Sequence, residues 1–109
     1  MTERDPTPLV RDIMQDFARC TGLDPPTSSP KRYLWTDAFA VCNELGLFQR
    51  TNDPAYRDLA LHLVGQVHHV LGRHRDDDPR TGWISGLREQ EGELHPTIGG
   101  LRIGKKLNE

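Results

Sequence analysis

Apolar residues recur at helical spacing in three separate parts of the chain. In the first part, residues 7 to 20, the apolar positions are Leu9, Val10, Ile13, Met14 and Phe17. Steps of three and four residues place these side chains on one face, so the pattern predicts an amphipathic helix. Thr7 can cap the start of this helix, and Gly22 can end it. The three prolines of "LDPPTSSP", residues 23 to 30, then predict a linker without regular structure.

The second part, residues 36 to 50, is apolar around almost the whole circumference of the helix that it predicts. Its apolar residues are Ala38, Phe39, Ala40, Val41, Cys42, Leu45, Leu47 and Phe48. Such a helix has to be covered on more than one side, because an ordinary surface helix carries a single apolar stripe. The same stretch contains Glu44, a candidate general acid that has no second carboxylate to work with.

The third part begins at "TNDPAY", a strong start signal for a helix over residues 54 to 72. Asn52 or Asp53 can serve as the N-cap, and Pro54 suits the first helical position. The apolar positions that follow are Tyr56, Leu59, Ala60, Leu63, Val67, Val70 and Leu71. Because only a few residues separate this helix from the one before it, the two are predicted to form an antiparallel hairpin.

The remaining residues, 73 to 109, are rich in glycine and follow neither a helical nor a strand period. A short helical turn is expected within residues 85 to 93, where "SGLREQE" resembles a capping box. The rest is typical of a loop that leads away to a missing element. The sequence therefore predicts one all-α domain, with helices over 7–20, 36–50 and 54–72 and a loop-rich last third.

Charge and composition exclude several classes of partner. Fourteen basic and sixteen acidic residues give a net charge of −2, which is too balanced for a nucleic-acid footprint. No apolar stretch approaches the roughly 20 residues needed to cross a bilayer, and the N-terminus lacks a secretory signal, so a cytoplasmic location is expected. Cys20 and Cys42 fall on apolar helical faces, where buried free thiols are expected.

The histidines of "QVHHVLGRHRDDD" invite a metal-site interpretation that helix geometry argues against. His68 and His69 are adjacent, so their side chains diverge by roughly 100°. His62 and His69 share a face but are separated by about 10 Å along the helix axis. We expect neither a metal nor a cofactor, and we expect His68 to be half-buried. A metal-dependent enzyme that uses these histidines is the weakest alternative.

Three residues are candidates for ligand binding. Trp35 and Asp37 together could form an aromatic floor and a carboxylate near a helix end, an arrangement common in sugar sites. Trp83 lies in "TGWISG", where the flanking glycines could leave its face accessible. Each has a structural alternative, because Asp37 also suits the positive end of a helix dipole and Trp83 also suits an anchor within the fold.

Two stretches, "RYLWTDAFAVCN" and "QVHHVLGRHR", together with the hairpin between them, resemble six-hairpin (alpha/alpha)-toroid proteins, and a bacterial group among them in particular. This superfamily includes many glycosidases and sugar epimerases. The resemblance covers residues 31 to 104. It implies a carbohydrate ligand, with Trp35, Asp37 and Trp83 at one mouth of the barrel. A complete toroid needs a much longer chain, so the resemblance implies an N-terminal piece without enzymatic activity of its own.

No catalytic residue is carried over from the superfamily, because no motif in this sequence matches one residue by residue. A second hypothesis is a helical interaction module. In that case the excess apolar faces of the helix over 36–50 would be buried against a partner chain or a second copy.

Overall fold

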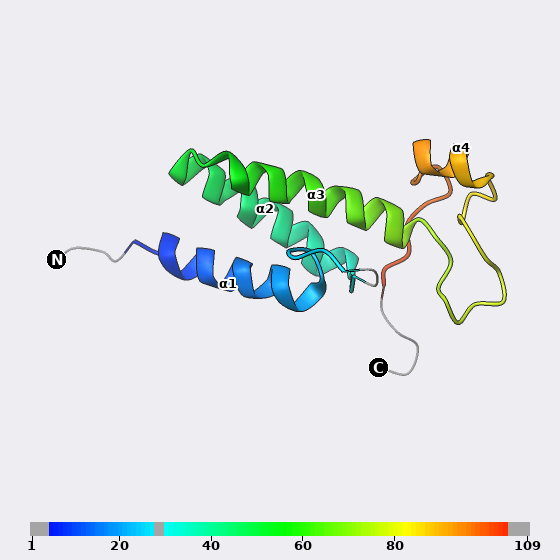
Figure 1. The fold of residues 1–109 in the computed structure, drawn as a ribbon, viewed down its shortest axis with the longest axis horizontal. Helices are drawn as coiled ribbons and strands as arrows, with labels where there is room; N and C mark the ends of the chain where they lie inside the picture. The colour runs from blue at the N-terminus through cyan, green and yellow to red at the C-terminus, as the bar shows by residue number, and fades with distance from the viewer. Residues whose placement is uncertain (1–4, 28–29, 105–109) are drawn as a thin grey trace.

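The computed structural model of the chain describes residues 5–27 and 30–104. It contains four helices, α1 (Thr7–Thr21), α2 (Leu34–Thr51), α3 (Pro54–Leu71) and α4 (Glu89–Leu94), and no β-strand among the described residues. The all-α prediction is confirmed. Figure 1 shows α1, α2 and α3 side by side in an elongated body, with α4 and a long loop beyond the end of α3.

The boundary between α2 and α3 shows how local sequence sets the helix ends. Asn52 adopts a left-handed conformation, with φ of 58°, and ends α2. The Asp53 carboxylate caps α3 by accepting a hydrogen bond from the Ala55 N–H at 3.0 Å. Of the two predicted caps, Asp53 is therefore the one that is used, and the short connection makes α2 and α3 the predicted antiparallel hairpin.

The start of α1 differs from the prediction. Thr7 lies inside the helix instead of capping it, and Pro6 precedes it. The Thr7 N–H and hydroxyl both donate to the Asp5 carboxylate, at 3.0 and 2.6 Å. Asp5 thus accepts the hydrogen bond at this helix start, because its side chain reaches past the proline. Gly22 ends α1 as expected, with φ of 80°.

The core lies between the three long helices. It is formed by Met14 and Ala18 of α1, Ala40 and Leu47 of α2, and Leu63, Val67 and Leu71 of α3, with Leu23 from the linker. The described part of the 23–30 linker has no helix, as predicted, and residues 28 and 29 lie outside the described residues.

The expectation that α2 is covered on several sides is not met by the residues that the structure describes. Its buried face carries Ala40, Glu44 and Leu47, whereas Phe39 on the other side is 68 % exposed. The prediction of buried thiols is also wrong, since Cys20 and Cys42 are both exposed. Cys42 lies on the uncovered side of α2. Cys20 follows the buried Ala18 by two residues, which turns it away from the core by roughly 200°.

The last third is mostly loop, as predicted, but within the described residues it folds back instead of leading away. The Ile84 N–H donates to the Gly72 carbonyl at 2.9 Å, and the Arg102 N–H donates to the Leu71 carbonyl at 2.7 Å. The Leu34 N–H donates to the Ile103 carbonyl at 2.8 Å. Residues 101–104 thus connect the end of α3 to the start of α2. The predicted turn within 85–93 is found at α4, and residues 105–109 lie outside the described residues.

None of the helices in the described part of the chain has the length and apolar content needed to cross a membrane.

Candidate functional site

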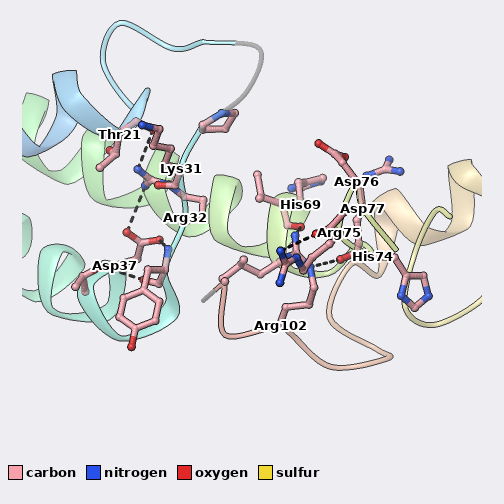
Figure 2. A pocket seen from close by; sticks show the side chains of 17 residues that line it. Thr21, Lys31, Arg32, Asp37, His69, His74, Arg75, Asp76, Asp77 and Arg102 are labelled. Carbon is pink, nitrogen blue, oxygen red and sulfur yellow. Dashed lines mark hydrogen bonds and ion pairs between the residues drawn. The ribbon is translucent and has the colours of Figure 1, made fainter. Parts of the chain in front are cut away.

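A groove of about 1130 Å³ lies where the start of α2, the end of α3 and the returning C-terminal segment meet. Its charged lining residues are Lys31, Arg32, Arg73, Arg75, Arg102, Asp37, Asp76 and Asp77. His69 and His74 also line it. Figure 2 shows Lys31, Arg32 and Asp37 on one side of the groove. His69, Arg75, Asp76, Asp77 and Arg102 lie on the other side.

One wall of the groove is built on a buried ion pair between Arg32 and Asp37. Their side chains are 0 % and 1 % exposed, and Arg32 Nη1 lies 3.7 Å from Asp37 Oδ1. Arg32 also donates from Nε to the Lys31 carbonyl at 2.8 Å. Burial raises the pKa of the Asp37 carboxyl, and the positive charge of Arg32 opposes that shift. The pair anchors the segment before α2 against the body of the protein.

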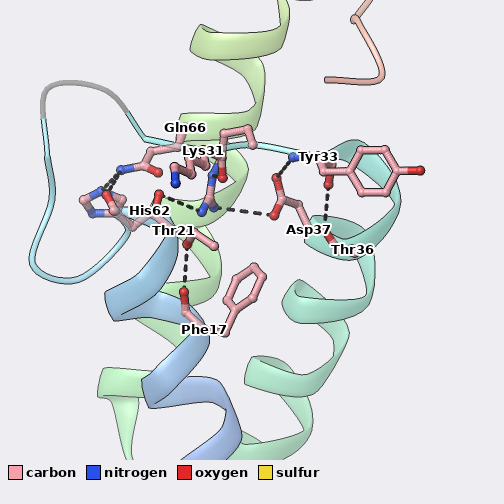
Figure 3. Close-up of polar contacts among 10 residues, drawn as sticks. Phe17, Thr21, Lys31, Tyr33, Thr36, Asp37, His62 and Gln66 are labelled. Atoms are coloured by element: carbon pink, nitrogen blue, oxygen red, sulfur yellow. Dashed lines mark hydrogen bonds and ion pairs between the residues drawn. The ribbon is translucent and has the colours of Figure 1, made fainter. Parts of the chain in front are cut away.

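Asp37 also holds the start of α2. Its Oδ2 accepts a hydrogen bond from the Tyr33 N–H at 3.0 Å, and the Thr36 hydroxyl donates to the Tyr33 carbonyl at 3.1 Å (Figure 3). A carboxylate here satisfies a backbone donor that the helix leaves unpaired and faces the positive end of the helix dipole. The Asp37 carboxylate is therefore directed into the protein.

The other wall closes the C-terminal end of α3. The Arg102 guanidinium donates from Nε to the Arg73 carbonyl at 2.5 Å and from Nη2 to the Val70 carbonyl at 3.0 Å. These contacts satisfy carbonyls at a helix end that would otherwise lack donors. Burial lowers the pKa of Arg102, Arg75 lowers it further, and Asp76 and Asp77 oppose both effects. Arg102 and Arg75 are thus close enough for their like charges to interact.

The three predicted binding residues are not brought together. Trp35 is 60 % exposed on the outer side of α2, whereas Asp37, two residues later, faces Arg32. Trp83 is 2 % exposed, so the expectation of an accessible face is wrong. The Arg73 guanidinium lies 4.0 Å from its ring centroid, and a Cβ on Gly92 of α4 would collide with the ring. Trp83 is an anchor of the C-terminal loop.

The histidines behave as helix-surface residues. His68 is half-buried, as expected, and His69 is exposed, with Nδ1 2.7 Å from the Gly65 carbonyl. His62 Nε2 lies 3.3 Å from the Gln66 side-chain nitrogen. Across residues 5–27 and 30–104, no group of three His, Cys, Asp or Glu side chains is arranged to hold a metal ion.

Glu44 is the most unusual titratable group outside the groove. It is 1 % exposed, and its Oε2 has no hydrogen-bond partner among the described residues. Burial raises its pKa to about 7. It lines a second cavity of about 290 Å³ between the helices, together with Arg11, Met14 and Tyr56. Its burial was readable from the sequence, because steps of four and three residues place Ala40, Glu44 and Leu47 on one face.

Arg32 and Arg102 were not identified from the sequence as site residues. The partners of Arg102 are the carbonyls of Val70 and Arg73, which are far away along the chain. No local pattern predicts that contact.

Comparison of the chain with protein-family models, curated proteins and solved structures found no match.

Proposed function

We propose that the chain is a helical interaction unit whose α2 binds a further helical hairpin through an exposed apolar surface. This surface, the α2 stripe, consists of Trp35, Ala38, Phe39, Cys42 and Leu45, all of which are exposed. Their spacing of three and four residues places them along one side of the helix. The single observation that carries the proposal is that this stripe lies opposite the buried face of α2.

Covering the stripe would be energetically favourable. Phe39 is 68 % exposed and Trp35 is 60 % exposed, so both side chains retain most of their area for a partner. Burying one aromatic side chain contributes about 2 kcal/mol. Single exposed apolar residues are ordinary on protein surfaces, but a continuous apolar patch usually marks an interaction site.

The resemblance to (alpha/alpha)-toroid proteins suggests the form of the partner. In such proteins, hairpins pack against neighbouring hairpins of the same chain. The proposed partner is therefore a helical hairpin of the same kind, supplied by a longer protein or by a second copy. An isolated unit of this type has no catalytic turnover of its own.

The two cysteines allow a matched test of this proposal. Cys42 lies within the α2 stripe and Cys20 lies on α1 outside it, and both are exposed. As the protein concentration rises, maleimide labelling of Cys42 should slow relative to Cys20 while light scattering reports a growing mass. If the isolated chain stays monomeric, it should instead bind an apolar-surface dye. A clean monomer with low dye binding would contradict the proposal.

Two substitutions separate the stripe from exposed apolar surface in general. Phe39 on α2 and Leu61 on α3 are 68 % and 64 % exposed, which makes them comparable. Phe39→Ser should remove self-association or dye binding, whereas Leu61→Ser should leave both unchanged. Equal effects of the two variants would show that the stripe has no special role.

A carbohydrate ligand is a second proposal, and the exposed ring of Trp35 supports it. Aromatic rings commonly line ligand sites. Asp37 and Trp83 do not contribute to a shared site with Trp35, because one is ion-paired and the other is buried. A panel of neutral glycans should change the fluorescence of the protein, and Trp35→Phe should abolish that change. No response across the panel would remove this proposal.

A further inference from the structure

We infer that the groove between the start of α2 and the end of α3 binds a small anion, through a carboxylate or phosphate group of the ligand. The inference does not depend on the α2 stripe, because it concerns different residues and a different surface. It rests on the balance of charge in the groove, on which cations are paired, and on the placement of the groove walls.

The groove is positive within a chain that is negative overall. Five cationic side chains line it, against the three carboxylates of Asp37, Asp76 and Asp77, which gives the lining a formal charge of +2 with neutral histidines. The whole chain has a net charge of −2. A concave surface lined by an excess of one sign of charge concentrates the electrostatic potential and attracts ligands of the opposite sign.

Two of the five cations form no ion pair within the described residues, although Asp76 and Asp77 lie near enough to act on the charge of Arg102. Arg32 pairs with Asp37, Arg73 with Glu89 and Arg75 with Asp77. Lys31 and Arg102 form no ion pair with a described residue. In Figure 2 these two residues come from opposite sides of the groove. An anion between the two walls would therefore meet positive charge from both.

The buried Arg32–Asp37 pair beneath the groove has no net charge, so the excess positive charge comes from the other lining residues. The Arg32 side chain is 0 % exposed, and its Nη1 has no hydrogen-bond partner among the described residues. Its charge is balanced by the Asp37 carboxylate, whose side chain is 1 % exposed. Burial is the main cause that lowers the pKa of Arg102; Arg75 acts in the same direction, and Asp76 and Asp77 oppose both. A bound anion would favour the charged form of Arg102.

The acidic residues of the groove favour a small anion over a polyanion. The volume of about 1130 Å³ is large enough to admit a ligand of the size of a sugar or a nucleotide. Asp76 and Asp77 lie at the same groove and would repel the repeated phosphates of a nucleic acid.

The two tryptophans provide a built-in reporter and a reference. Trp83 packs against Arg73 and His69, both of which line the groove, and its ring centroid is 5.9 Å from that of His69. Trp35 does not line the groove. NMR titrations of the whole chain with inorganic phosphate, glucuronate and glucose, at low ionic strength, would follow the indole N–H resonances of both residues.

We expect the chemical shift of the Trp83 indole N–H to change saturably with phosphate, with glucuronate or with both. The chemical shift of the Trp35 indole N–H should not change. A response to phosphate alone would identify a phosphate group as the ligand, and a response to glucuronate alone would identify a sugar carboxylate. The affinity should fall as salt is added. No response to either anion, or an equal response to glucose, would overturn the inference.

Charge variants test which residues are responsible. Lys31→Gln should weaken binding by about two- to fivefold, as expected for one exposed charge. Asp76→Asn should strengthen it, because a repulsive carboxylate is removed. Arg11→Gln is the matched control, since Arg11 is exposed on α1 and does not line this groove. An equal loss in Lys31→Gln and Arg11→Gln would show non-specific attraction and would contradict the site.

Arg102 needs a conservative variant because it also holds the end of α3. Arg102→Lys keeps the charge and should retain binding within a fewfold. Arg102→Gln should lose binding, and its fold is checked by circular dichroism. If Arg102→Gln remains folded and binds as the wild type does, Arg102 is not part of the site.

Discussion

Glu44 is a carboxyl group that the surrounding helices keep away from water. It is 1 % exposed, and one of its oxygens lacks a hydrogen-bond partner among the described residues. A buried carboxyl without a partner favours its neutral, protonated form, because the charged form loses its hydration. The packing of α2 therefore makes the stability of the protein depend on pH.

The sign of this dependence follows from the raised pKa. The folded protein holds the Glu44 proton up to a pKa of about 7, whereas the unfolded chain releases it near 4.5. The contribution of Glu44 to the free energy of unfolding is therefore greatest below the lower value and is lost as pH rises towards the higher one. The loss attributable to Glu44 is on the order of 3 kcal/mol. Asp37 contributes in the same direction, since its pKa is also raised.

We predict that Glu44→Gln flattens this fall without abolishing folding. Urea denaturation at pH 5 and at pH 8 measures the difference, and the variant should lose less stability between the two values than the wild type does. Glu93→Gln, an exposed substitution on α4, is the control and should behave as the wild type. An unchanged difference in Glu44→Gln would show that other groups cause the pH dependence.

The helices could be predicted from the sequence because the residues that start and end a helix lie close to its ends. The Asp53 cap, Pro54 and the left-handed Asn52 all lie within three residues at the α2–α3 turn. The burial of Trp83 and the position of Arg102 were not predictable. Both depend on contacts between residues far apart in sequence, and no periodic pattern encodes those contacts.

The cap of α3 gives a second prediction. Asp53→Ala removes the acceptor for the Ala55 N–H and should reduce the free energy of unfolding by about 1 kcal/mol. Asp58→Ala on the same helix removes only an exposed ion pair with Arg57 and should cost less than about 0.5 kcal/mol. Thermal and urea denaturation of both variants compare the two effects, and a loss in Asp58→Ala as large as in Asp53→Ala would refute the capping role.

Across the molecule, the two tryptophans differ in exposure and in what they contact. Trp35 lies on the outside of α2, and Trp83 fastens the loop of the last third to the end of α3. One is available to a partner, and the other is committed to the fold. The resemblance suggested a common role for both, which the burial of Trp83 rules out.

We predict that Trp83→Ala loosens the C-terminal third and leaves the three long helices folded. Removing a buried tryptophan typically costs about 3–5 kcal/mol. Here the loss should appear first in the loop, because Trp83 contacts Arg73 and Gly92 and not the central core cluster. Hydrogen exchange should accelerate over residues 73–104. Trp35→Ala should leave exchange unchanged, and uniform acceleration over α1 to α3 in Trp83→Ala would contradict the prediction.

The hydrogen bonds from Arg102 to Leu71 and from Leu34 to Ile103 join segments that are far apart in the sequence. This separation bears on the order in which the parts of the protein fold. Helices and a short-turn hairpin form from neighbouring residues, and such contacts are made rapidly. The contact of residues 101–104 with α2 closes a long loop, so it is expected after the hairpin exists. Arg102 and Gly104 of this late segment line the groove. During synthesis, the hairpin can therefore fold as soon as it emerges, whereas the groove is complete only after residues 101–104 have been made.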